Sequence, residues 1–126
     1  MAEDVALILI VEDDPDIRSV VQLALKLDGG LSVVAVEKGE AALEKLRAGL
    51  KPALILIDAH LPDMDGVALA QAVSLIDAAT PFAFLTASVR ASERERYIAA
   101  GALSVIPKPF DPLTLADQVK SLLSLT

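Results

Sequence analysis

Acidic, hydroxyl and ammonium side chains follow several short apolar runs of this sequence. Glu12 and Asp13 come after the first run, Asp58 follows another, Thr86 closes a further one, and Lys108 follows the last. If these runs are neighbouring strands, the carboxylates converge, and carboxylates about 4 Å apart repel by roughly 4 kcal/mol per pair at an effective dielectric near 20. Such a cluster requires a cation, and ligation by oxygen alone favours Mg²⁺ or Mn²⁺.

A divalent metal beside a carboxylate indicates phosphoryl chemistry, which depends on positioning and on stabilisation of charge. Asp58 is the candidate nucleophile and would form an acyl phosphate. Lys108 would neutralise one phosphoryl oxygen, and the Thr86 hydroxyl would donate to another. Each acid could instead cap the next helix, which is the role expected of Asp14. Two acidic strand ends together with Thr and Lys endings favour a shared site over separate caps.

Short apolar runs alternate with helical patterns along the chain. The expected strands cover residues 6–11, 31–36, 53–57, 81–86 and 104–106. The expected helices run from 15 to the glycine pair 29–30, over 40–48, from 66 to about 76, from 92 to 101, and from 112 to 123. Asp14-Pro15 and Asp111-Pro112 each combine an N-cap residue with proline at the first helical position. Ser92 and Glu95 match a capping box and predict a helix start at Ser92.

Strict alternation of five strands and five helices implies parallel crossovers, and therefore a sheet covered by helices on both faces. The expected fold is α/β, a single doubly wound domain over residues 1–126 without an output domain. In such folds ligands bind beyond the carboxyl ends of the strands. The polar residues described above lie at those ends.

Composition argues against several classes of protein. No apolar run reaches the roughly 18–20 residues that a membrane span needs, and the acidic start is unlike a secretory leader. With no cysteine and a single histidine, disulfides and thiolate metal sites are excluded and zinc is disfavoured. A net charge of −7 with few aromatic residues argues against direct binding of nucleic acid. A soluble cytoplasmic protein is expected.

From about Leu7 to Leu123 the chain resembles the receiver domain of two-component response regulators. The motifs that carry the resemblance occur in a fixed order and are Ile8-Leu9-Ile10-Val11-Glu12-Asp13-Asp14, Asp58 with Leu61-Pro62-Asp63-Met64-Asp65-Gly66, Thr86-Ala87, Gly101-Ala102 and Lys108-Pro109-Phe110. The resemblance implies a flavodoxin-like (βα)5 fold with strand order 2-1-3-4-5. It also implies Mg²⁺-dependent transfer of a phosphoryl group from a phosphohistidine to Asp58.

The resemblance assigns further roles to the site residues. Asp13 resembles a direct Mg²⁺ ligand and Glu12 a ligand acting through water, and Asp58 and the backbone carbonyl of His60 are the further ligands. Thr86 resembles the switch hydroxyl and Lys108 its ionic partner. The peptide bond after this lysine is expected to be cis. The His60 side chain and Ser88 occupy positions that tune hydrolysis of the acyl phosphate in the family.

The resemblance also implies partners. The donor would be a histidine kinase or a histidine phosphotransfer protein, and a downstream protein would bind the face made by the fourth helix, fifth strand and fifth helix. The chain would be a monomer or a phosphorylation-dependent dimer. It would catalyse only its own phosphorylation and dephosphorylation, without an external substrate.

Two positions depart from the family's pattern. At the position of Val105 the family usually has an aromatic residue, whose inward or outward rotamer changes with the position of the switch hydroxyl. A proline directly before the lysine, here Pro107, is also unusual. Tyr97 could substitute for that aromatic, although packing is its default role. Three alternatives therefore stay open: a degenerate receiver that only binds partners, a phosphohydrolase with an aspartyl intermediate, and a flavodoxin-like binding module. The phosphohydrolase would need a second acid where this chain has His60. The flavodoxin-like module would need a phosphate-binding loop after the first strand, where this chain has acidic residues.

Overall fold

The structure is a computed structural model that describes residues 5–87 and 90–125. Within them the strands are β1 (Ala6–Val11), β2 (Leu31–Val36), β3 (Leu54–Asp58), β4 (Phe82–Thr86) and β5 (Val105–Pro107). The helices are α1 (Pro15–Lys26), α2 (Gly39–Arg47), α3 (Gly66–Ile76), α4 (Ala91–Ala99) and α5 (Pro112–Leu123). All strand pairs are parallel, in the order β2-β1-β3-β4-β5. The predicted fold and strand order are confirmed.

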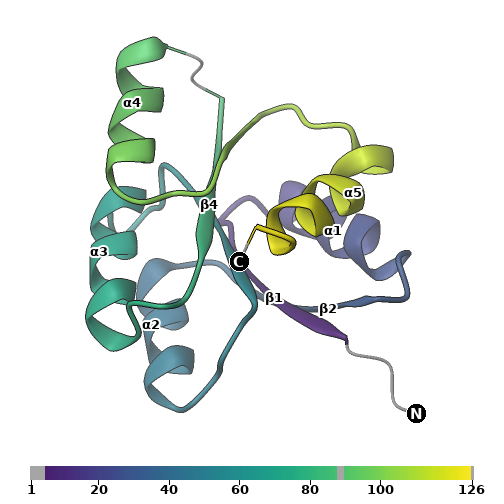
Figure 1. Cartoon of the computed structure of the whole chain (residues 1–126), viewed down its shortest axis with the longest axis horizontal. Coiled ribbons are helices and arrows are strands. Elements are labelled where there is room, and N and C mark those ends of the chain that lie inside the picture. Colours follow the sequence, from purple (N-terminus) through teal and green to yellow (C-terminus); the bar gives the residue numbers. More distant parts are fainter. Residues whose placement is uncertain (1–4, 88–89, 126) are drawn as a thin grey trace.

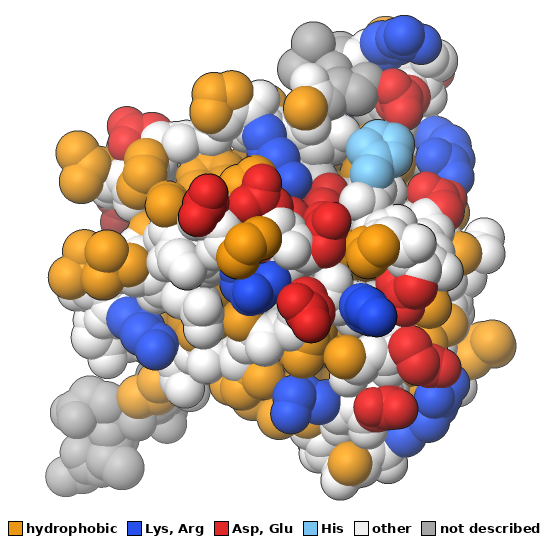
Figure 2. Space-filling view, turned by 180° about the vertical axis from the view of Figure 1, so that it is seen from behind, with side chains coloured by type: hydrophobic (Ala, Val, Ile, Leu, Met, Phe, Trp, Pro, Cys, Tyr) orange, Lys and Arg blue, Asp and Glu red, His pale blue; other side chains and the backbone are white. Residues whose placement is uncertain are grey.

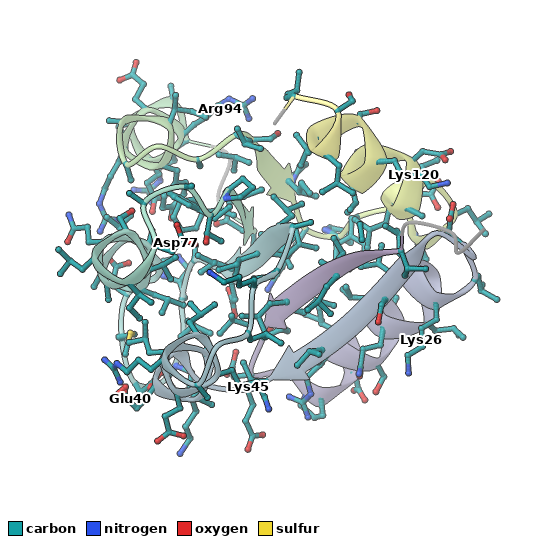
Figure 3. The ribbon with its side chains drawn as sticks, turned by 60° about the horizontal axis from the view of Figure 1, so that its bottom comes forward. Lys26, Glu40, Lys45, Asp77, Arg94 and Lys120 are labelled. Atoms are coloured by element: carbon teal, nitrogen blue, oxygen red, sulfur yellow. The ribbon has the colours of Figure 1, made fainter. Side chains whose placement is uncertain are left out.

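Helices cover both faces of the sheet. α2, α3 and α4 lie on one side, and α1 and α5 lie on the other (Figure 1). Side chains fill the space between each helix layer and the strands (Figure 3). Alternate residues of β1 enter different cores, since Leu9 and Val11 pack toward α2, α3 and α4 whereas Ile8 and Ile10 pack toward α1 and α5. Burial on both faces explains why the central strands are apolar throughout.

Two helices begin as the Asp-Pro pairs predict. The Asp14 carboxylate accepts hydrogen bonds from the backbone N–H groups of Asp16 and Ile17, at 2.9 and 3.3 Å. Asp111 accepts from the N–H of Leu113 at 2.9 Å. Such caps satisfy N–H groups that have no partner inside the helix. The first cap turns the chain into α1 immediately after the acidic residues that follow β1, so these residues stay at the edge of the sheet.

The prediction that α4 begins with a capping box at Ser92 is wrong. α4 begins at Ala91, and Ser92 lies inside its first turn. Arg90 is the N-cap residue with extended backbone (φ −64°, ψ 137°), and its carbonyl accepts from Arg94 N at 3.0 Å. An N-cap residue has non-helical backbone, which Arg90 has and which Ser92, inside the helix, does not, so Ser92 cannot act as the cap.

Two strands are displaced by one residue from the prediction. β3 ends at Asp58 rather than before it, and β5 runs from Val105 to Pro107. Proline has no N–H to donate, but Pro107 lies on an edge strand, where it pairs with Thr86 of β4. The next residue resumes the pairing, because Lys108 N donates to the Thr86 carbonyl at 2.8 Å. Lys108 is thereby fixed at the end of β4.

Over the face seen in Figure 2, Lys and Arg side chains are scattered among Asp and Glu rather than gathered into one basic patch. Among the described residues, none of the helices has the length and apolar character that crossing a bilayer requires.

Candidate functional site

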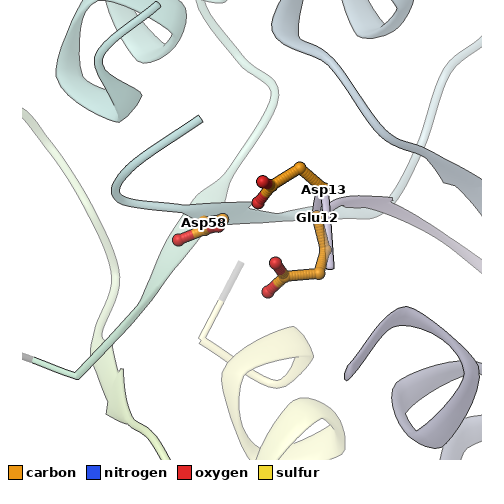
Figure 4. A group of neighbouring side chains, drawn as sticks. All are labelled: Glu12, Asp13 and Asp58. Carbon is orange, nitrogen blue, oxygen red and sulfur yellow. The ribbon is translucent and has the colours of Figure 1, made fainter. Parts of the chain in front are cut away.

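Three carboxylates converge at the carboxyl edge of the sheet. Glu12 and Asp13 directly follow β1, which pairs with β3 so that Val11 lies opposite Ile57. One oxygen each from Glu12, Asp13 and Asp58 lies within 4.8 Å of the others. The three side chains point into the same space from the ends of these strands (Figure 4). The sheet therefore assembles the predicted acidic cluster.

Lys108 is the cation that faces this cluster. Its Nζ lies 2.7 Å from Glu12 Oε1 and 3.4 Å from Asp58 Oδ1, and its side chain is 15% exposed. Burial alone would lower the pKa of Lys108, but the contacts with Glu12 and Asp58 outweigh it and raise the pKa. The ammonium therefore stays charged at neutral pH. The Lys108–Pro109 peptide is cis, as the resemblance implies.

Glu12 is almost completely buried, with 1% of its surface exposed. Burial raises the pKa of Glu12 to about 6; Asp58 adds to the rise, while Lys108 and the N–H of Asp14 oppose it. Glu12 Oε1 is ion-paired but makes no bond of hydrogen-bond geometry among the described residues. The single positive charge of Lys108 thus faces two buried carboxylates, so the cluster keeps a net negative charge.

The donor set suits a hard divalent cation. All the available ligand atoms are carboxylate oxygens, and the exposed Asp13 leaves room for water ligands. Mg²⁺ and Mn²⁺ take such oxygen ligands and usually keep several waters. The excess negative charge is what such an ion would neutralise.

Asp58, the predicted nucleophile, is the last residue of β3 and is 5% exposed. Its Oδ1 accepts a hydrogen bond from the N–H of His60 at 3.1 Å. His60 forms an isolated antiparallel bridge with Asp65, which closes the loop after the strand. The His60 side chain is exposed. The role of its carbonyl as a ligand stays a prediction, and Ser88 lies outside the described residues.

Thr86 reaches the same edge from β4. It is the last residue of that strand and is 1% exposed. β4 pairs with β3 so that Leu85 lies opposite Asp58, which places Thr86 one residue further along. Every strand end that the sequence singled out therefore belongs to one edge of the sheet.

Arg18 supports the site and was missed by the sequence analysis. Its Nη1 donates to the backbone carbonyl of Glu12 at 3.0 Å and to that of Asp13 at 3.4 Å. The same nitrogen lies 3.8 Å from Glu37. Arg18 thus ties the backbone of both acids to α1. The sequence does place Arg18 four residues after the Asp14 cap, in the first turns of α1 and near the acids. Its partners, however, are backbone carbonyl groups, and no sequence pattern identifies those.

Gly66 allows the loop that carries the acceptor to pack against α3. Its N–H donates to the Ala59 carbonyl at 3.0 Å. A Cβ at this position would lie 2.9 Å from the Asp58 carbonyl oxygen and 2.9 Å from Ala59 Cα. Both atoms belong to the backbone, so a side chain here would have to displace the acceptor strand itself.

Gly66→Ala should therefore lower the free energy of unfolding by about 1–3 kcal/mol, the usual cost of forcing extra atoms into a packed region. Urea unfolding measures the effect. Gly29→Ala is the matched control, because no heavy atom lies within 4 Å of its Cβ and it should be nearly neutral or slightly stabilising. Equal stability of the two variants would contradict the packing described.

Asp63 ties the same loop to α2. Its two carboxylate oxygens accept from the N–H groups of Gly39 and Glu40, each at 3.0 Å, while the N-cap residue Lys38 provides no side-chain cap. Burial alone would raise the pKa of Asp63, but the hydrogen bonds from Glu40 and Gly39 outweigh it and lower the pKa. The charged form of this carboxylate therefore stabilises the start of α2.

Asp63→Ala should lower the free energy of unfolding at neutral pH by about 1 kcal/mol, the usual effect of removing a helix cap. Because the folded-state pKa lies below the ordinary 3.8, this contribution is complete above pH 3.8 and is lost as pH falls through the folded-state pKa. Urea unfolding across this range should show wild type and variant converging at low pH. Asp117→Ala, at an exposed position on α5, is the control and should change the free energy of unfolding at neutral pH by no more than about 0.5 kcal/mol. A gap that stays constant with pH would contradict the role of the charge.

Comparison with known proteins points to the same family that the sequence motifs resemble. A family model described as the response regulator receiver domain matches residues 8–120. The transcriptional regulatory protein CseB of Streptomyces coelicolor is 35% identical over 116 residues, which cover 92% of this chain and 48% of CseB. The chain thus spans about half the length of that curated relative.

Solved structures are similar over nearly their full length. The chemotaxis response regulator CheY4 of Vibrio cholerae superposes with a TM-score of 0.84 at 29% identity, over 94% of this chain and 98% of that one. A CheY-like receiver domain protein from Methanospirillum hungatei superposes with a TM-score of 0.86 at 26% identity, over 96% and 95%.

Proposed function

Because the chain belongs to the response regulator receiver domain family, we propose that its Asp58 accepts a phosphoryl group from a phosphohistidine. The donor is a histidine kinase or a histidine phosphotransfer protein. The observation that carries this proposal is the convergence of Glu12, Asp13 and Asp58 with Lys108 at one edge of the sheet. The cluster contains a nucleophile, oxygen ligands for a cation and a fixed positive charge.

The Asp58 carboxylate is the attacking group. One of its oxygens forms a bond to phosphorus as the bond between phosphorus and the donor's imidazole nitrogen breaks, and the electron pair returns to that nitrogen. Its Oδ1 is held by the His60 N–H, so the side chain is already oriented before the donor arrives. Fixing a nucleophile in this way removes part of the entropic cost of the reaction.

Charge on the transferred group is offset by neighbouring residues. Lys108, 3.4 Å from Asp58 Oδ1, pairs with one phosphoryl oxygen, and the Thr86 hydroxyl donates to another. Glu12, Asp13, Asp58 and the His60 carbonyl are the proposed ligands of Mg²⁺, with Mn²⁺ as a substitute. When bound, the ion supplies positive charge beside a phosphoryl oxygen, where charge stabilisation is the main requirement of phosphoryl transfer.

The chain then transmits a signal through protein contacts. We place the output surface on α4, β5 and α5, in a monomer or a phosphorylation-dependent dimer, and the reaction in the cytoplasm. The chain catalyses only its own phosphorylation and dephosphorylation. A second function, that of a receiver that binds partners without being phosphorylated, is favoured by one observation, Val105 at a position where the family usually has an aromatic residue.

Incubation with acetyl phosphate and Mg²⁺ tests the proposal. Intact mass should rise by one phosphoryl group per chain, and EDTA should prevent the rise. Fast hydrolysis could hide the adduct, so formation of a beryllofluoride complex, a stable stand-in for the acyl phosphate, is measured in parallel by fluorine NMR. If neither the adduct nor the complex formed, the unphosphorylated partner-binding function would replace this one.

A further inference from the structure

The Arg18 side chain reaches back over the start of α1. Arg18 is the fourth residue of the helix, and its backbone N–H donates to the Asp14 carbonyl at 2.9 Å. Side chains of an α-helix lean toward its N-terminus, so the guanidinium points to the residues that precede the helix. Only 23% of the side chain is exposed, so the guanidinium is partly shielded from water.

The groups that Arg18 reaches are the backbone carbonyls of the two acids after β1. Strand pairing of β1 ends at Val11, so the carbonyls of Glu12 and Asp13 lie beyond the paired strand. Arg18 Nη1 donates to both of them, at 3.0 and 3.4 Å. One nitrogen of a planar, rigid guanidinium therefore fixes two successive peptide groups relative to α1.

The three carboxylates of the cluster differ in how their side chains are held. Glu12 is paired with Lys108 and also accepts from the N–H of Asp14 at 3.2 Å. Asp58 accepts a backbone hydrogen bond and also faces Lys108. The exposed Asp13 carboxylate points toward the other two, but it makes no hydrogen bond or ion pair with any described residue (Figure 4). Its direction therefore depends on its own backbone, which the guanidinium holds.

Glu37, in the turn after β2, is a weaker partner of Arg18. Its nearest carboxylate oxygen lies 3.8 Å from Arg18 Nη1, and its side chain is 64% exposed. An ion pair between groups as exposed as this contributes little, because water screens the charges. The contacts with the two carbonyls are shorter, so they are the ones through which Arg18 acts on the site.

Arg18 also brings a positive charge to a site that would hold a cation. By its charge alone it would repel Mg²⁺, so its removal would strengthen binding. By holding the backbone of Asp13 it reduces the freedom that this ligand loses when an ion binds, so its removal would weaken binding. The two effects have opposite signs, and the metal affinity of an Arg18 variant shows which of them is larger.

We propose that Arg18 is a positioning residue for the metal site, which it serves by holding the carbonyls of Glu12 and Asp13. The inference rests on the proposed function, in which these acids bind Mg²⁺. Glu12 and Asp58 keep their own side-chain contacts when Arg18 is removed. Loss of Arg18 therefore acts mainly on the direction of the Asp13 carboxylate.

Calorimetric titration of the whole chain with Mg²⁺ tests the inference. Arg18→Met keeps an apolar stem and removes the donor, and it should weaken Mg²⁺ binding about 10-fold. This is the lower end of the 10–100-fold range for groups that orient metal ligands, because Arg18 acts through the backbone and not on the carboxylate itself. An affinity equal to or higher than that of wild type would overturn the inference.

Two further variants separate the carbonyl contacts from the ion pair and from the charge. Glu37→Gln removes only the ion pair, and it should bind Mg²⁺ within about twofold of wild type. Arg18→Lys keeps the charge, and its affinity should lie between those of wild type and Arg18→Met, because an ammonium does not match the shape of the guanidinium. It also serves as the test if Arg18→Met does not fold. Wild-type affinity in Arg18→Lys, or a 10-fold loss in Glu37→Gln, would overturn the inference.

Urea unfolding in EDTA distinguishes positioning from a purely structural role. If Arg18→Met were less stable than wild type but bound Mg²⁺ equally well, Arg18 would only support the fold. That result would overturn the inference and leave the proposed function standing, provided that wild type binds Mg²⁺ and gains a phosphoryl group from acetyl phosphate. If wild type bound no Mg²⁺ and formed neither the adduct nor the beryllofluoride complex, the proposed function would fail, and this inference with it.

Discussion

Asp58→Asn should abolish the gain of a phosphoryl group from acetyl phosphate in the presence of Mg²⁺. The neutral amide is not a nucleophile toward phosphorus, and the substitution also removes one oxygen ligand from the cluster. The fold should persist, because Lys108 keeps its closest partner, Glu12 Oε1, at 2.7 Å. Intact mass, with circular dichroism as a check on folding, measures the outcome.

Asp117→Asn is the matched control for this experiment. It makes the same change of charge at an exposed position of α5, away from the strand ends. The control should be phosphorylated to the same extent as wild type. A phosphoryl group on the Asp58→Asn protein would contradict the assignment, and fragmentation of that adduct would show whether Asp13, the exposed acid of the cluster, had taken it.

Lys108→Met should lower the free energy of unfolding in EDTA by about 3 kcal/mol. Removing one partner of a buried ion pair leaves the other charge uncompensated, at about 3–5 kcal/mol, and the 15% exposure of Lys108 favours the lower end. The pKa of Glu12 is already raised to about 6, so a further rise in the variant would allow it to bind a proton and would limit the loss. Urea unfolding in EDTA measures the effect.

Mg²⁺ should stabilise Lys108→Met more than it stabilises wild type. In the variant a divalent ion would supply the charge that the lysine provided, and a ligand that binds only the folded state stabilises it by mass action. Lys45→Met, at an exposed position of α2, is the control and should change stability by no more than about 0.5 kcal/mol. A Lys108 variant as stable as wild type in EDTA would mean that the buried pair contributes nothing to folding.

The sequence by itself determined the order of elements and the edge on which the site lies. Short continuous apolar runs bounded by turn residues are typical of strands buried on both faces, and alternation with helices makes the sheet parallel. The carboxyl ends of parallel strands meet at one edge, so Glu12, Asp58 and Thr86 could be grouped without a structure. The caps at Asp14 and Asp111 were also local, because each side chain bonds to N–H groups two or three residues away.

Only the tertiary structure decided how charge and bulk are distributed around that edge. Lys108 Nζ lies closer to Glu12 than to Asp58. Arg18 donates a hydrogen bond to the Glu12 backbone carbonyl, a group that every residue has and that no sequence motif marks. Whether Tyr97 is a surface aromatic or a buried one depends on how α4 docks on the sheet, where Tyr97 packs in one core cluster with Phe84 of β4 and Val105 of β5. Contacts between elements depend on three-dimensional distance and burial, and spacing along the chain encodes neither.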